Sequence, residues 1–276
     1  MLSIIIPSFN DPRILRAIAS VRRFDDTDSV QLVIVDGGSD KELIMRVREV
    51  LAPQDLLIWE SDKGIFDALN KGLDNVAGNM IGWIGSDDVF HGDVKASEII
   101  AALESSDICI AGTAMVDQGR IKRTFWLPRN PQKAAFLGLH NPHFSTFGRT
   151  DVLRRARFDI QSPIADIGYF LDVFASNPSV HVDRRIVTLQ QVGGFSNSSL
   201  RNSFRYNALT YPLYRKHVSP AQAALASVIK VVPKVLSAIF YKLKATPVNS
   251  EHLSADFEAH GNTRKSRCWE KVLPDE

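Results

Sequence analysis

The feature that most constrains the fold is an alternation of short apolar runs with amphipathic stretches over residues 2–84. The apolar runs lie at residues 2–6, 31–35, 56–59 and 80–84, and the stretches between them have apolar residues at helical spacing. Uninterrupted apolar strands are typical of parallel sheets whose two faces are both covered. Repeated strand–helix units with right-handed crossovers build a doubly wound α/β sheet. The sequence therefore predicts a mostly parallel sheet with helices on both faces.

Each of these four strands runs into a polar side chain: Ser8, Asp36, Asp62, and the adjacent pair Asp87 and Asp88. The carboxyl ends of parallel strands share one rim, where open α/β sheets bind their ligands. Two neighbouring carboxylates repel each other unless a cation lies beside them. A hard divalent ion with oxygen ligands suits that place and would in turn bind a diphosphate. The rim thus predicts a nucleotide site, although the acidic pair alone is also compatible with a simple turn.

Two common nucleotide-binding motifs are missing from the sequence. No Gly-x-Gly-x-x-Gly follows the first strand, and no Gly-x-x-x-x-Gly-Lys-Ser/Thr occurs in the chain. A dinucleotide-dependent enzyme and a P-loop enzyme are therefore both disfavoured. A carboxylate-bound metal is another way to hold phosphates.

Charge and cysteine usage limit the partners and the compartment. The net charge is +2, but residues 200–276 hold 12 Lys and Arg against 6 Asp and Glu, so the C-terminal part of the chain is basic. Neither this balance nor any motif predicts nucleic-acid binding. The two cysteines form no disulfide or zinc pattern, which indicates a reducing, cytoplasmic setting. The N-terminus is predicted to be a strand rather than a signal peptide, and no apolar run is long enough to span a membrane.

Several short motifs resemble those of family 2 glycosyltransferases with the GT-A fold. Their order and spacing together cover roughly residues 2–200. They are SIIIPSFN at 3–10, IVDGGSD at 34–40, DKGIFDALNKG at 62–72, SDD at 86–88, NPH at 141–143, IAD at 164–166 and GGFS at 193–196. The last three are similar to landmarks of the polysaccharide and O-antigen branch. The Gln-x-x-Arg-Trp motif of processive synthases is absent, which favours addition of one sugar per encounter.

The resemblance assigns roles to four aspartates. It implies that Asp36 contacts the base of a nucleoside diphosphate sugar, that Asp87 approaches the ribose, and that Asp88 binds Mg²⁺ or Mn²⁺ on the diphosphate. It implies that Asp166 is the general base that deprotonates the acceptor hydroxyl. A single base acting in line inverts the anomeric configuration. General-base catalysis typically contributes ~10²–10⁴-fold.

Further residues are expected to bind the donor, and each has a structural alternative. The expected donor contacts, besides Asp36 and Asp87, are Pro7, Ser8, Phe9, Asp62, Lys63, Gly64 and Asn70. Phe9 either stacks on the base or is a buried aromatic. Asp62 and Lys63 are a donor contact or a surface pair, and Asn70 also fits a tie between its helix and a neighbouring loop. Trp59 and Trp83 are expected in the core.

Two predicted catalytic-site residues also have alternatives. Asp166 would make a good N-cap for the helix that follows it. The family often places an aromatic and a second acid after its base, whereas Ile167 and Gly168 stand here. His143 is a candidate metal ligand or phosphate contact, and a structural histidine is the other interpretation.

The chain is predicted to have three parts: a GT-A domain at 1–200, basic amphipathic helices at 201–246 and a flexible polar tail at 247–276. Apolar residues recur at helical spacing over 219–244 with lysines opposite, and Pro233 should kink this segment. Such a stripe resembles a helix lying in a membrane interface. Packing on the catalytic domain or on a second subunit explains it equally simply.

Together these observations predict a metal-dependent inverting glycosyltransferase. It would move one sugar to a glycan or lipid-linked acceptor in cell-surface polysaccharide synthesis. The expected location is the cytoplasm, with peripheral contact to the inner face of the membrane. A nucleotidyltransferase acting on sugar phosphates and a non-catalytic nucleotide-sugar-binding protein stay open. The first would need a glycine-rich basic loop where residues 7–10 read PSFN.

Overall fold

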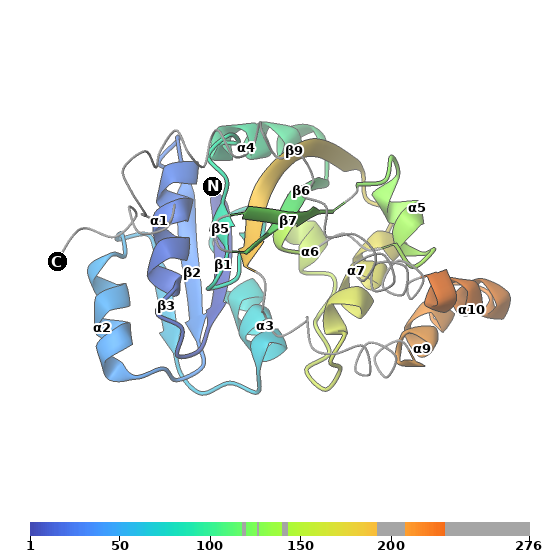
Figure 1. The fold of residues 1–276 in the computed structure, drawn as a ribbon, viewed down its shortest axis with the longest axis horizontal. Coiled ribbons are helices and arrows are strands. Elements are labelled where there is room, and N and C mark those ends of the chain that lie inside the picture. Colours follow the sequence, from blue (N-terminus) through green and yellow to red (C-terminus); the bar gives the residue numbers. More distant parts are fainter. Residues whose placement is uncertain (118–119, 126, 140–142, 192–207, 230–276) are drawn as a thin grey trace.

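The computed structural model describes residues 1–117, 120–125, 127–139, 143–191 and 208–229 (Figure 1). The expectations for Asn141 and Pro142, for the motif at 193–196 and for the helix beyond residue 229 lie outside these residues. The same holds for the kink at Pro233 and for the predicted tail. None of the helices within the described ranges is long and apolar enough to cross a bilayer.

The described strands form one sheet in the order β3-β2-β1-β4-β8-β6-β9-β5, with β7 attached to β6. Their bounds are β1 Leu2–Ser8, β2 Val30–Asp36, β3 Leu56–Trp59, β4 Met80–Trp83, β5 Val89–Phe90, β6 Ile108–Asp117, β7 Arg120–Thr124, β8 Thr146–Arg149 and β9 Val180–Gln191. The helices are α1 Ile14–Phe24, α2 Lys41–Glu49, α3 Ile65–Asn75, α4 Ala96–Ser105, α5 Pro131–Ala135, η1 His143–Ser145, α6 Thr150–Leu153, α7 Ala165–Ala175, α9 Thr210–Arg215 and α10 Pro220–Ile229.

The first four strands are parallel neighbours, as the alternation of strands and helices predicts. Beyond them the sheet is mixed, because β8 runs antiparallel to both β4 and β6 while β9 runs parallel to β6. β6 and β7 form a hairpin. β9 is a single strand whose pairing with β6 is interrupted by register shifts. The α/β class, with helices on both faces, is confirmed.

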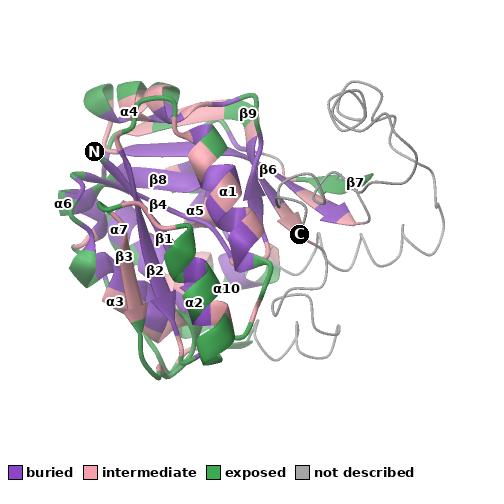
Figure 2. Ribbon diagram, turned by 90° about the vertical axis from the view of Figure 1, so that its left-hand side faces the viewer, coloured by how far each residue is buried: buried purple, intermediate pink, exposed green. Residues whose placement is uncertain are grey.

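Two apolar cores lie on the two faces of this sheet. On one face, Ile4, Ile6 and their neighbours pack against α1 and α4. On the other, Ile5 and Val33 pack against α3 and α7. Alternate residues of a strand point to opposite faces, so one apolar run serves both cores. Figure 2 shows the central strands buried between the helices.

One local expectation is wrong. Trp59 is 41% exposed and donates from Nε1 to the carbonyl of Ser39 at 3.0 Å, so it lies outside the core. Trp83, by contrast, is fully buried as expected.

Candidate active site

The ends of β1, β2 and β3 meet at one rim, as predicted. Ser8 pairs with Asp36 in the ladder, and Asp36 pairs with Trp59. The backbone continues the contact past the strands, since Gly37 N–H donates to the carbonyl of Ser8 at 2.9 Å and Glu60 N–H donates to that of Asp36 at 3.1 Å. Parallel pairing therefore brings these residues together from positions far apart in the sequence.

The loop after β1 exposes an aromatic ring beside an unpartnered hydroxyl. Ser8 Oγ is buried and has no hydrogen-bond partner among the described residues. Phe9 is 64% exposed, which rules out the buried-aromatic alternative. Pro7 lies in β1 and is buried. Asn10 adopts a φ of 47° and accepts from Asp40 N–H at 3.0 Å, so the loop is tied to the one after β2. Phe9 is thus free to contact a ligand, while the buried hydroxyl of Ser8 lies just before it in the chain.

Asp36 organises the loop after β2. Its Oδ1 accepts from the N–H groups of Gly38 at 3.1 Å and Ser39 at 2.6 Å, and its Oδ2 accepts from the Ser39 hydroxyl at 2.6 Å. The side chain is only 1% exposed. Any contact of Asp36 with a base would therefore come on top of its role in holding this turn.

The loop after β3 lies against the loop after β2. A Cβ on Gly37 would meet Asp62 Oδ2 at 2.7 Å, so only glycine lets the two loops approach this closely. Asp62 Oδ1 accepts from the N–H of Gly64 at 2.8 Å, and Gly64 adopts a left-handed φ of 110°. The backbone N–H of Lys63 donates to Asp67 Oδ2 at 3.0 Å. The side chain of Lys63 is exposed at the rim.

Asn70 does not fit the predicted donor role. Its Nδ2 donates to the carbonyl of Phe158 at 2.8 Å, and its Oδ1 accepts from the N–H of Phe158 at 3.0 Å. Both polar ends of the side chain are used, so Asn70 ties α3 to the segment before α7. These bonds agree with the structural alternative predicted for Asn70, a tie between its helix and a neighbouring loop.

The acidic pair follows β4, and its second member is buried. Asp88 is 5% exposed, and its Oδ1 accepts from Gln191 N–H at 3.0 Å. Burial, followed by the charge of Asp87, raises the pKa of Asp88 to about 7. Burial also raises the pKa of Asp87. A Cβ on Gly85 would meet Asp88 Oδ2 at 2.8 Å, so the glycine makes room for the carboxylate.

A cation that the sequence analysis missed stands beside this pair. Arg13 Nη1 lies 3.6 Å from Asp87 Oδ2. Its guanidinium is held by Asp11 through Nε at 2.8 Å and Nη2 at 2.9 Å, and Asp11 also accepts from the Ser86 hydroxyl at 3.0 Å. The only signal in the sequence is a basic residue shortly after the rim loop of β1, which is too weak to predict the contact.

The donor set at the rim suits a hard cation only in part. Asp87 and Asp88 supply carboxylate oxygens, the ligands that Mg²⁺ and Mn²⁺ prefer. The raised pKa of Asp88 shows a buried acid whose charge lacks compensation, which a cation would provide. Within the described residues, no group of three or more His, Cys, Asp or Glu side chains could hold a metal. A diphosphate would supply further oxygen ligands for such an ion.

A second group of candidate residues consists of His143 and Asp166, whose side chains lie near each other. His143 Nδ1 lies 3.9 Å from Asp166 Oδ2, and burial lowers the pKa of the histidine. His143 Nε2 is buried without a partner among the described residues. Asp166 is in the first turn of α7, where Ile164 is the N-cap and no side chain caps the helix. The capping alternative for Asp166 is therefore wrong.

Trp83 connects the acidic rim to the helix of Asp166. Its indole Nε1 donates to the carbonyl of Thr146 at 2.7 Å, directly after η1. Its ring meets Tyr169 and Phe170 of α7 edge to face, with centroids 5.9 and 6.5 Å away. Trp83 is the last residue of β4 and lies four residues before Asp87. Its rigid side chain therefore links the acidic rim to α7, which carries Asp166.

Comparison with solved structures agrees with this arrangement. The fold is similar to that of residues 1–349 of S. aureus TarS in complex with UDP-GlcNAc, with a TM-score of 0.61, 13% identity, and coverage of 99% of this chain and 81% of that one. It is also similar to the mannosyltransferase PcManGT from Pyrobaculum calidifontis in complex with GDP-Man and Mn²⁺, with a TM-score of 0.54, 15% identity, and coverage of 98% and 83%.

The sheet and these neighbours define a fold of the GT-A class. Residues 3–163 match the model described as glycosyl transferase family 2. The chain belongs to this family, which favours a transferase over the nucleotidyltransferase and the non-catalytic binder.

The relatives in sequence are also glycosyltransferases. A PGL/p-HBAD biosynthesis glycosyltransferase of Mycobacterium bovis (strain BCG / Pasteur 1173P2) is 32% identical over 122 residues, which cover 42% of this chain and 47% of that protein. An uncharacterised glycosyltransferase of Mycobacterium tuberculosis (strain CDC 1551 / Oshkosh) is 28% identical over 105 residues, covering 37% and 39%. The match to the first spans about half the length of that relative.

Proposed function

We propose that this protein is a metal-dependent, inverting glycosyltransferase that transfers one sugar from a nucleoside diphosphate sugar. The observation that carries the proposal is Asp88, a buried acid at the end of β4 with a pKa raised to about 7. A buried carboxylate that lacks a counter-charge destabilises the fold. Binding of the donor with Mg²⁺ or Mn²⁺ would supply this counter-charge, which explains a buried acid beside Asp87.

The donor is proposed to lie along the rim of the first four strands. Phe9 is exposed for stacking on the base, and the free hydroxyl of Ser8 faces the same loop. Asp36 shapes the loop that would meet the base, while Asp62 with Lys63 and Gly64 closes its edge. Asp87 would approach the ribose, with Arg13 beside it. The similar fold of PcManGT, which was solved in complex with GDP-Man and Mn²⁺, supports a metal–diphosphate arrangement of this kind.

The chemistry needs a base for the acceptor and charge compensation for the leaving group. Asp166 takes the proton from the acceptor hydroxyl as the oxygen attacks C1 and the bond from C1 to the diphosphate breaks. His143 lies beside it, with Nδ1 3.9 Å from Asp166 Oδ2, and lines the same part of the site. The metal, when bound, supplies Lewis-acid stabilisation of the departing diphosphate. Attack from the face opposite the leaving group inverts the anomeric carbon.

The acceptor is proposed to be a glycan or lipid-linked glycan in cell-surface polysaccharide synthesis of the O-antigen type, on the cytoplasmic side of the membrane. The described part of the C-terminal segment supports a peripheral contact. In α10, Ala223 and Ala226 are buried, while Leu225 and Val228 are 53% and 60% exposed. The small residues pack on the domain and the large apolar ones face away from it. Self-association through this face is the competing interpretation.

A donor-consumption assay tests the proposal. Wild-type protein is incubated with labelled nucleotide sugars, with Mn²⁺ or with EDTA, and release of nucleoside diphosphate is followed. We expect release only with metal, and Asp88→Ala should abolish it together with metal-dependent donor binding. Glu104→Gln, which removes an exposed carboxylate on α4, is the matched control. Turnover that persists in EDTA or in Asp88→Ala would refute the metal-dependent mechanism.

A further inference from the structure

The loop that joins β3 to α3 is held against its neighbours on both sides. It comprises residues 60–64, which include three of the proposed donor contacts, and we call it the donor loop. At its start, Glu60 N–H donates to the carbonyl of Asp36 at 3.1 Å. Asp62 then lies so close to Gly37 that a Cβ on the glycine would meet Asp62 Oδ2 at 2.7 Å. These contacts fix the side of the donor loop that faces the loop after β2.

The other side of the donor loop is held by Lys71, which reaches back from the second turn of α3. Its Nζ lies 2.8 Å from Glu60 Oε1 and donates to the carbonyl of Ser61 at 3.1 Å. Asp67 Oδ2 lies 3.8 Å from the same nitrogen. An ammonium group has three donors, and oxygens of three residues surround this one. Lys71 therefore binds the donor loop itself rather than a ligand.

Asp67, in the first turn of α3, holds the end of the donor loop. Its Oδ2 accepts from the backbone N–H of Lys63 at 3.0 Å, and the same oxygen faces Lys71. The helix that carries both side chains is a rigid support, because Leu69 and Leu73 are fully buried in the core under the sheet. Lys71 and Asp67 thus connect the donor loop to a packed helix at two points.

The charges near the donor loop also give Lys71 a task. Between residues 60 and 67 the chain holds Glu60, Asp62 and Asp67 against Lys63 alone. A nucleoside diphosphate is an anion, so uncompensated carboxylates at this edge oppose its approach. Lys71 pairs with Glu60 and Asp67, which are two of the three carboxylates.

We propose that Lys71 is a positioning residue for the donor, which together with Asp67 fixes the donor loop in the conformation that presents Asp62 and Lys63. The inference rests on the proposed function, because it explains how residues assigned to the donor are held. A loop that is ordered in advance adds no ordering cost to binding. If release from Lys71 leaves the held conformation ~10% populated, donor affinity falls ~10-fold.

Two measurements on Lys71→Met, which keeps the aliphatic stem and removes the ammonium group, test the proposal. The first is hydrogen exchange of the backbone amides of Lys63 and Gly64 in the donor-free protein, which should become ~10-fold faster as the loop opens more often. The second is calorimetric titration with UDP or GDP and Mn²⁺, in which the affinity should fall ~10-fold. With saturating labelled nucleotide sugar, kcat should stay within ~2-fold, because the loss is one of binding. Lys71→Arg should restore both readouts.

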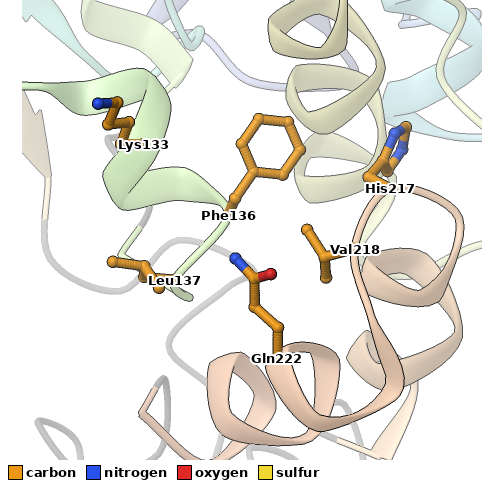
Figure 3. A pocket seen from close by; sticks show the side chains of 6 residues that line it. All are labelled: Lys133, Phe136, Leu137, His217, Val218 and Gln222. Carbon is orange, nitrogen blue, oxygen red and sulfur yellow. The ribbon is translucent and has the colours of Figure 1, made fainter.

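Two control variants lie away from the rim. Lys95→Met is the matched one, because Lys95 Nζ also donates to a backbone carbonyl, that of Arg23 at 2.8 Å, at the end of α1 opposite the rim. Gln222→Ala is the second, since Gln222 lines a cavity of about 350 Å³ beside α5, α9 and α10, elements that contribute nothing to the donor loop (Figure 3). Both variants should keep wild-type exchange at residues 60–64 and wild-type nucleotide affinity.

Asp67→Ala, which removes the acceptor for Lys63 N–H, provides a second variant should Lys71→Met fail to fold, and the same two changes are expected. If wild type binds and consumes the donor while both variants keep wild-type affinity, the inference is wrong and the proposed function stands. Faster exchange without loss of affinity also overturns it, because the loop is then held for stability alone. If wild type binds neither nucleoside diphosphate and consumes no donor, the proposed function fails, and the positioning role fails with it.

Discussion

Replacing Asp88 by asparagine should stabilise the metal-free protein, and the gain should grow with pH. The side chain is 5% exposed, and its pKa rises from 3.8 to about 7 because of burial and of the neighbouring charge on Asp87. A carboxyl group with a raised pKa in the folded state binds its proton more tightly when folded. Between pH 3.8 and about 7 the folded state therefore holds more protons than the unfolded one, and stability falls as pH rises.

The size of the effect follows from the shift. About three pKa units at 1.36 kcal/mol each give a penalty of ~4 kcal/mol once the group is ionised. The same linkage gives ~0.5 kcal/mol at pH 4 and ~4 kcal/mol at pH 8. Asparagine avoids the penalty because it stays neutral, and its Oδ1 can still accept from Gln191 N–H. A gain of this size is a large part of the ~5–15 kcal/mol that stabilises a typical domain.

The assay is urea unfolding of wild type and Asp88→Asn in EDTA, from pH 4.5 to 8, followed by circular dichroism. The quantity of interest is the difference in unfolding free energy between the two proteins, since groups that do not interact with Asp88 titrate equally in both. Glu104→Gln is the control and should follow wild type at every pH. Adding Mn²⁺ with a nucleoside diphosphate at pH 8 should raise the melting temperature of wild type more than that of Asp88→Asn. A difference that is flat with pH, or that favours wild type at pH 8, would refute the argument.

Three further predictions concern the base, a structural tie and the exposed face of α10. Asp166→Asn should lower turnover by ~10²-fold or more while donor affinity changes only a few-fold, because a general base acts in the transition state; an equal loss of donor binding would assign Asp166 a binding role. Asn70→Ala should cost ~1–3 kcal/mol in urea unfolding, because the backbone groups of Phe158 lose both partners. Asn75→Ala, which breaks only a hydrogen bond within α3, is the control. If Asn70→Ala lowers donor affinity without loss of stability, Asn70 belongs to the donor site. Leu225→Glu combined with Val228→Glu should abolish flotation with anionic liposomes while Met45→Glu floats like wild type; failure of wild type to float would rule out the membrane contact.

The sequence alone was sufficient for the first half of the sheet. Apolar runs of four or more residues separated by helical stretches leave few arrangements other than a parallel sheet covered on both faces. Asp87 and Asp88 follow directly from this, because a residue adjacent to a strand in sequence must lie at its end. The mixed second half was harder, since β8 and β9 join the sheet at positions that local patterns do not specify.

Only the tertiary structure decided what the individual side chains do. Burial raises the pKa of Asp88 to about 7, and the N–H that its Oδ1 accepts belongs to Gln191, 103 residues away. Asn70 is a tie rather than a donor contact because Phe158 lies 88 residues further on in the chain and uses both ends of its amide. Arg13, which follows β1, meets Asp87, which follows the neighbouring β4, and His143 lies near Asp166 from a different element. Residue type and local spacing set which groups a chain offers, but their burial and partners depend on long-range packing, which local spacing does not encode.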